Sequence, residues 1–137
     1  MKIYAVIDTN VIVSALITTR EDSPTRLILD YLLKGRIIPV YNEEILKEYL
    51  EVLTRSKFKL SKDLVLSLLD IIRQTGLFKD RVHSKVDMPD AKDVVFYEVT
   101  LSKKSAYLVT GNIKHFPKEK FIVTPSEMID IMEHSNN

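Results

Sequence analysis

Short apolar runs along the chain alternate with longer segments in which apolar residues recur every three to four positions. Residues 3–7 and 37–41 are apolar runs rich in β-branched side chains, a pattern typical of strands buried on both faces of a parallel sheet. Residues 106–109 and 121–123 are shorter runs of the same kind, and residues 77–82 predict one further strand. These runs predict a central, mainly parallel sheet of four or five strands.

Helical periodicity occupies the segments between these strands. Ser23, Asn42 and Ser61 predict helix N-caps, and either Thr9 or Asn10 is expected to cap the first helix. Strands that alternate with helices are typical of an α/β fold in which right-handed crossovers place helices on both faces of the sheet. With their caps, the predicted helices cover residues 9–17, 23–34, 42–53, 61–75, 93–101 and 125–132.

Composition narrows the class of protein. The chain has 137 residues, the size of one domain, so we expect a single domain over residues 1–134 and a frayed tail at 135–137. The 20 Lys and Arg residues nearly balance the 19 Asp and Glu residues, so binding to nucleic acid requires a local basic patch. The absence of cysteine excludes disulfides and thiolate metal sites. Neither a membrane span nor a signal peptide is predicted, and we expect a cytoplasmic location.

Polar residues follow two of the predicted strands. Asp8 comes directly after the first strand, and Asn112 follows the pair Thr110-Gly111 at the end of a later one. A strand-end Asp also serves as a turn or cap residue, but burial of the strand on both faces favours a functional role for Asp8. In open parallel sheets, ligands bind beyond the carboxyl ends of the strands, which is where both side chains are predicted to lie.

A second group of acidic residues lies on the predicted helix at 42–53. Glu44, Glu48 and Glu51 recur at spacings of four and three residues, and such a run is usually a solvated face. Glu48 borders the buried stripe of this helix and so is a candidate to point into a cleft. Helical geometry alone does not choose between Glu48 and Glu44.

A third acidic group precedes the helix at 93–101. Asp87, Asp90 and Asp93 lie within seven residues. One of them is expected to cap the helix, because a carboxylate there accepts hydrogen bonds from free backbone N–H groups and complements the helix dipole. Three acidic residues exceed what capping requires.

Gathering these carboxylates at one sheet edge is electrostatically costly unless a cation lies between them. Carboxylate and amide oxygens without cysteine select Mg²⁺ or Mn²⁺, and such sites typically serve phosphate chemistry. A P-loop, a dinucleotide-binding fingerprint, a zinc-protease motif and a nucleophile elbow are all absent from the sequence. The three histidines, His83, His115 and His134, are expected to lie in solvent.

Four stretches in order along the chain carry a family resemblance. They are the Asp-Thr-Asn triplet after the first strand and residues 43–53, 90–98 and 107–116. Through them the chain resembles the PIN domain family, and within it the single-domain ribonucleases of the VapC type, which are toxin components of toxin-antitoxin pairs. The resemblance covers almost the whole chain and implies a PIN-like three-layer α/β/α sandwich.

The resemblance also implies the site residues. Asp8, Glu48 and Asp93 match the family's metal-binding acids, with Asp90 as a neighbouring or alternative ligand. Many members have Asp where this chain has Asn112, and the neutral amide weakens the case for a second metal without affecting the first. The matching catalytic residues are Asp8, Glu48, Asp93 and Asn112, and the matching substrate-binding residues are Thr9, Asn10, Thr110 and Lys114.

The implied activity is hydrolysis of RNA phosphodiesters by water activated by Mg²⁺ or Mn²⁺, without a covalent intermediate. Two other functions stay open: a catalytically silent PIN fold that binds RNA or protein, and a phosphatase of the haloacid-dehalogenase type. The phosphatase would need an Asp two residues after Asp8, where this chain has Asn10. Two sets of basic residues are candidates for steering RNA, although solvated loops are the default interpretation of both. They are Lys92, Lys103, Lys104, Lys114, Lys118 and Lys120, and Arg55, Lys57, Lys59 and Lys62.

The resemblance further implies a homodimer and a small antitoxin whose tail brings an Arg or Lys into the acidic cleft. The helices at 42–53 and 61–75 carry more large apolar residues than one side of a small sheet is expected to cover, so we predict an exposed patch that a dimer would bury. The alternative is that the two helices pack on each other as a hairpin. The residues concerned are Ile45, Leu46, Leu50, Leu53, Leu64, Val65, Leu68, Leu69 and Ile72.

Overall fold

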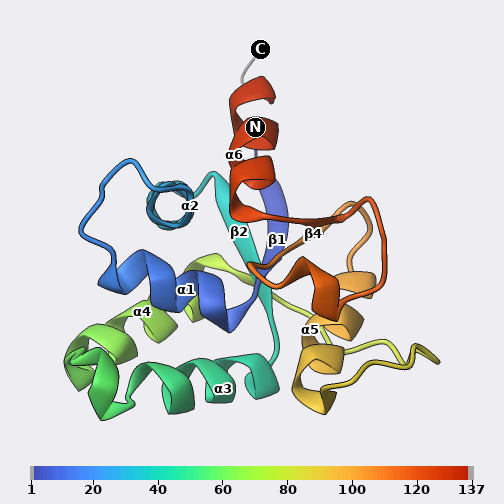
Figure 1. Ribbon diagram of the computed structural model, residues 1–137, viewed down its shortest axis with the longest axis horizontal. Coiled ribbons are helices and arrows are strands. Elements are labelled where there is room, and N and C mark those ends of the chain that lie inside the picture. The colour runs from blue at the N-terminus through green and yellow to red at the C-terminus, as the bar shows by residue number, and fades with distance from the viewer. Residues whose placement is uncertain (1, 136–137) are drawn as a thin grey trace.

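A computed structural model describes residues 2–135, and within this range five parallel strands form one sheet in the order β3-β2-β1-β4-β5 (Figure 1). Both the α/β class and the parallel sheet agree with the sequence prediction. Asn136 and Asn137, which make up most of the predicted C-terminal tail, lie outside the described residues. The strands are β1 (Ile3–Ile7), β2 (Ile37–Tyr41), β3 (Leu77–Phe78), β4 (Tyr107–Val109) and β5 (Ile122–Val123).

The central strand β1 sets the position of the site. It pairs with β2 on one side and with β4 on the other, although β4 lies about a hundred residues later in the chain. Ile7 is in register with Val109, and the backbone N–H of Asp8 donates to the carbonyl of Val109 at 2.9 Å. The residues that follow β1 and β4 therefore emerge side by side at the carboxyl edge of the sheet.

Six helices flank the sheet within the described range, and they give the sandwich of the predicted class. In Figure 1, α2 and α6 lie together at the top of the view and α3 and α5 lie at the bottom, with strands between them. No helix in this part of the chain combines the length and apolar character needed to cross a bilayer. The helices are α1 (Thr9–Ile17), α2 (Pro24–Leu33), α3 (Glu43–Leu53), α4 (Lys62–Thr75), α5 (Ala91–Leu101) and α6 (Pro125–His134).

Local capping confirms three of the predicted helix starts. The side chains of Ser23, Asn42 and Ser61 accept hydrogen bonds from backbone N–H groups in the first turns of α2, α3 and α4. The prediction that Thr9 or Asn10 caps the first helix is wrong, because both residues lie inside α1 and Asp8 occupies the cap position without capping through its side chain. The Asp8 carboxylate is bonded elsewhere.

Three boundaries differ from the prediction by two residues or more, and β4 and β5 each begin one residue later than predicted. Strand β3 ends at Phe78 and not at residue 82, because the chain turns away from β2 and the N–H of Val82 donates to the carbonyl of Glu98 on α5. Helix α5 begins at Ala91 with Asp90 as its cap, two residues earlier than expected. Helix α6 continues to His134. The first difference arises from a tertiary contact and the second from a cap.

The predicted exposed apolar patch on α3 and α4 is wrong, because the two helices pack together as a hairpin. Leu50 is half-buried and only Leu64 of the set is exposed, at 46 %. The premise for the dimer therefore fails, and the dimer itself stays a prediction. The buried residues of the set are Ile45, Leu46, Leu53, Val65, Leu68, Leu69 and Ile72.

Gly76 allows α4 to end tightly against the sheet. A Cβ atom at this position would lie 2.5 Å from the carbonyl oxygens of both Ile72 and Pro39. Backbone atoms cannot move aside as the end of a long side chain does, so only glycine fits here.

Candidate active site

Asp8 stands where β1 and β4 end, and the fold surrounds it with donors. Its side chain is held by the Thr110 hydroxyl, which donates to Oδ2 at 2.7 Å, and by the Asn10 amide, which donates to the same oxygen at 3.0 Å. Asp8 is 5 % exposed and Thr110 is fully buried. Two partners from different segments therefore fix the orientation of a buried carboxylate.

The turn after β4 is tied to the start of α1. The N–H of Gly111 donates to the Asn10 side-chain oxygen at 3.0 Å, and the N–H of Asn112 donates to the Thr110 hydroxyl at 3.0 Å. A Cβ at Gly111 would lie 3.2 Å from that Asn10 oxygen, so this close approach favours glycine. Asn112 itself is exposed, although it follows the buried Thr110 by only two residues.

Helix α3 contributes Glu48 from the other side. The Thr9 hydroxyl donates to Glu48 Oε2, which joins the first residue of α1 to the middle of α3. The neighbouring Tyr49 is buried, and its hydroxyl donates to the carbonyl of Ile7, the last residue of β1. Glu48 is half-buried, whereas Glu44 and Glu51 are exposed.

The start of α5 brings the third carboxylate. Asp90 caps the helix by accepting a hydrogen bond from the N–H of Lys92 at 2.9 Å. Asp93 lies in the first turn with 17 % of its side chain exposed, and Nδ1 of His115 is 3.7 Å from its Oδ2. His115 is itself largely exposed, as predicted, but it stands at the site and not elsewhere in solvent.

Burial raises the pKa of three carboxyl groups at the site, and neighbouring negative charge adds to the effect for two of them. Burial raises the pKa of Asp8, although hydrogen bonds from Thr110 and Asn10 act in the opposite direction. Burial also raises the pKa of Glu48, and the negative charges of Asp8 and Asp90 add to this effect. The pKa of Asp93 rises to about 6, first through burial and then through the charges of Asp8 and Asp90. Such a cluster favours uptake of a proton or binding of a cation.

Two hollows border these carboxylates. Glu48 lines one of about 260 Å³ between α3 and α5, together with Lys92 and Phe96. Asp90, Asp93 and His115 line another of about 340 Å³. A larger hollow of about 560 Å³ begins at Ile113, directly after Asn112, and includes three lysines: Lys114, Lys118 and Lys120.

The donor set fits a hard divalent cation. Asp8, Glu48 and Asp93 offer carboxylate oxygens, and the amide of Asn112 offers a neutral oxygen nearby, which are the ligand types that Mg²⁺ and Mn²⁺ prefer. Among residues 2–135, no three acidic or histidine side chains converge closely enough to hold an ion in their present positions. Burial raises the pKa of all three carboxyl groups, and neighbouring negative charges add to this effect for Glu48 and Asp93. A bound cation would offset both costs of ionisation.

The structure brings together most residues that the sequence singled out. Thr9 and Thr110, expected to bind substrate, donate hydrogen bonds to Glu48 and Asp8 in this structure, and their role toward substrate stays a prediction. Sequence reasoning missed His115 and the hydroxyl of Tyr49 as neighbours of the site. A signal for His115 was present, since it follows Asn112 by three residues, within the last of the four family stretches.

Comparison with protein families gives one match. The model of the family described as PIN domain matches residues 4–114. No curated protein matches the chain. The matched range contains Asp8, Glu48, Asp93 and Asn112. It ends before β5, which forms one edge of the sheet, and before α6, which packs on α2.

Proposed function

The chain belongs to the PIN domain family, and on that premise we propose that it is an endoribonuclease of the VapC type that hydrolyses RNA phosphodiesters with Mg²⁺ or Mn²⁺. PIN domains are generally nucleases and typically use divalent metals. One observation carries the proposal. Asp8, Glu48 and Asp93 come from three separate segments to the carboxyl edge of the sheet, and all three carboxyl groups have raised pKa values.

Asp8, Glu48 and Asp93 would hold the ion, with Asn112 as a neutral neighbour. When bound, a divalent cation activates water for attack and neutralises charge on the scissile phosphate. The protein's own contribution is to orient the carboxylates. Thr110 and Asn10 fix Asp8, and Thr9 fixes Glu48, so these three residues support the ligands.

The lysine-lined hollow after Asn112 is the proposed path of the RNA backbone. Lys114, Lys118 and Lys120 line it, and it starts at the residue that follows Asn112. Lysine ammonium groups attract phosphates through charge, which provides affinity without sequence selection. Ile113, an exposed apolar residue, lines the same hollow.

The test is cleavage of single-stranded RNA by the purified chain with Mn²⁺, compared with the variant Asp8→Asn. The variant removes one negative charge but keeps an oxygen that accepts from Thr110 and Asn10, so the fold should persist. We expect cleavage to fall more than about 100-fold, because residues that only support metal ligands typically contribute 10–100-fold.

The matched control is Asp87→Asn, which makes the same change at an exposed position before α5. It should cleave as the natural chain does. Full activity of Asp8→Asn would refute the assignment of the site. Phosphate release from small phosphomonoesters without RNA cleavage would instead indicate a phosphatase, and tight RNA binding without turnover would indicate a silent binding module.

We also propose that a small antitoxin silences the site by bringing an Arg or Lys to the carboxylates. The experiment is binding of the neighbouring gene's product to the natural chain and to a variant with both Asp8→Asn and Asp93→Asn. Weaker binding to the variant supports the proposal. Equal binding would contradict it.

The proposed homodimer rests on the family resemblance alone. Light scattering at micromolar concentration decides it, because the chain has a mass of 15.8 kDa. A mass near this value at every concentration would exclude the dimer, and about twice this value would support it.

A further inference from the structure

Glu98 on α5 is a buried carboxylate that takes no part in the proposed chemistry. It is 4 % exposed. Its Oε2 accepts hydrogen bonds from the backbone N–H of Ser84 at 2.6 Å and from the Ser84 hydroxyl at 2.9 Å. Its Oε1 accepts from Nε of Arg81 at 2.8 Å. Burial acts to raise the pKa of Glu98, but the bonds from Ser84 and Arg81 outweigh it and lower that pKa, so the group is ionised.

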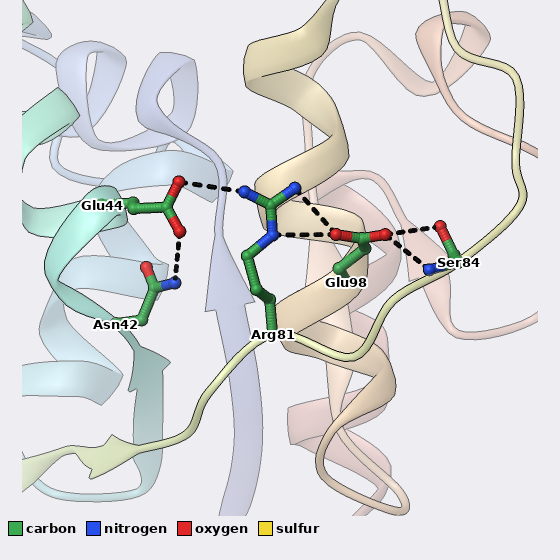
Figure 2. Close-up of polar contacts among 5 residues, drawn as sticks. All are labelled: Asn42, Glu44, Arg81, Ser84 and Glu98. Carbon is green, nitrogen blue, oxygen red and sulfur yellow. Dashed lines mark hydrogen bonds and ion pairs between the residues drawn. The ribbon is translucent and has the colours of Figure 1, made fainter.

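Arg81 connects this buried carboxylate to a second helix. Nη2 lies 2.7 Å from Glu98 Oε1, and Nη1 lies 3.0 Å from Oε2 of Glu44 on α3. Figure 2 shows the Arg81 side chain reaching between α3 and α5, with Glu44 on one side and Glu98 on the other. Because a guanidinium group is planar and its donors have fixed directions, it holds both carboxylates at a defined separation.

The two helices that Arg81 joins carry two of the proposed metal ligands. Glu44 precedes Glu48 by four residues on α3, so both lie on the same face one turn apart. Glu98 follows Asp93 on α5. These helices also meet through an apolar contact, with the rings of Tyr49 and Phe96 6.2 Å apart. Arg81 adds a direct ion-paired connection between α3 and α5.

We propose that the Arg81 bridge, defined by Arg81, Glu44 and Glu98, sets the spacing of α3 and α5 and so positions Glu48 and Asp93 for a divalent cation. This inference rests on the proposed function. Arg81 acts through the helices, so it is a positioning residue and not a ligand.

The test is Mn²⁺ affinity measured by titration calorimetry for Arg81→Lys, Arg81→Met and Glu44→Gln. Removing the positive charge of Arg81 from the neighbourhood of the carboxylates would tighten Mn²⁺ binding if charge alone mattered. If Arg81 instead positions the ligands, its loss should weaken Mn²⁺ binding. We expect Arg81→Met to weaken Mn²⁺ binding about three- to tenfold, which is at or below the 10–100-fold effect typical of residues that support metal ligands. Arg81→Lys keeps the positive charge but loses the planar guanidinium group with its fixed donor directions. It should therefore also weaken Mn²⁺ binding.

Glu43→Gln is the matched control for Glu44→Gln. Glu43 is the adjacent residue of α3, and it makes an exposed ion pair of 3.1 Å with Arg73, whereas the Glu44 pair measures 3.0 Å. Both substitutions remove one negative charge, but only Glu44→Gln opens the connection to α5. We expect Glu43→Gln to stay within about twofold of the natural chain, with melting temperatures of both variants within about 4 °C because exposed ion pairs contribute little.

Arg81→Met leaves the buried Glu98 carboxylate without its cation, which destabilises the fold. The test therefore depends on Arg81→Lys and Glu44→Gln. Unchanged Mn²⁺ affinity in both folded variants, in a natural chain that binds Mn²⁺ and cleaves RNA, would overturn the positioning role and leave the proposed function standing. A natural chain that neither binds Mn²⁺ nor cleaves RNA would overturn both.

Discussion

Asp93→Asn should make the protein more stable at neutral pH when no divalent cation is present. The pKa of Asp93 rises from 3.8 to about 6 in the folded chain. Below pH 3.8 the group is protonated in both the folded and unfolded states, so the substitution changes little. Between pH 3.8 and about 6 the unfolded chain releases the proton first. The carboxylate therefore lowers the free energy of unfolding increasingly as pH rises, and the effect is complete above about pH 6.

The magnitude follows from the size of the shift. A shift of about two pH units corresponds to about 3 kcal/mol at 1.36 kcal/mol per unit. Because the side chain keeps 17 % exposure at the mouth of the site, screening by solvent reduces this to about 2 kcal/mol. The charge also complements the α5 dipole from the first turn, which opposes the gain by about 0.3–1 kcal/mol. We expect a net stabilisation of about 1 kcal/mol near pH 7.5.

The assay is urea unfolding followed by circular dichroism in the presence of a chelator, at about pH 7.5 and about pH 4. Asp87→Asn is the control because it makes the same change at an exposed position. The gain for Asp93→Asn should be present at the higher pH and nearly absent at the lower one, while Asp87→Asn should stay within about 0.5 kcal/mol of the natural chain at both. An Asp93→Asn variant that is equally or less stable at about pH 7.5 would refute the electrostatic account.

Three further predictions test the site and its frame. Mn²⁺ at about 100 times its dissociation constant should raise the free energy of unfolding by about 2.7 kcal/mol. A chelator should reverse this effect, and Asp8→Asn should not show it. An unchanged melting curve for the natural chain would contradict metal binding. Gly76→Ala should lower the free energy of unfolding by at least about 2 kcal/mol in urea, because its Cβ would lie 2.5 Å from two backbone oxygens, and a neutral effect would show that this contact relaxes freely. Replacing Lys118 and Lys120 by Gln should reduce the slope of log RNA affinity against log salt concentration by about 0.7 per lost phosphate contact. An identical slope would show that the hollow lined by these lysines is not the RNA path.

Much of the fold and part of the site could be predicted from the sequence because the signals are local. Unbroken apolar runs gave the strands, and Ser23, Asn42 and Ser61 marked helix starts through side chains that bond within the same turn. The position of Asp8 directly after a buried strand placed it at the carboxyl edge of the sheet.

The tertiary structure decided what lies next to each of these residues, because sheet order and helix packing depend on contacts between distant segments. Asp8 meets Thr110 across 102 residues, and Thr9 meets Glu48 across 39. Periodicity could not distinguish Glu48 from Glu44, since both border the same helix stripe. Their roles are separated by the contacts with Thr9 and Arg81 and by the deeper burial of Glu48. Local patterns report which face of an element is buried, but they carry no record of which distant segment covers it.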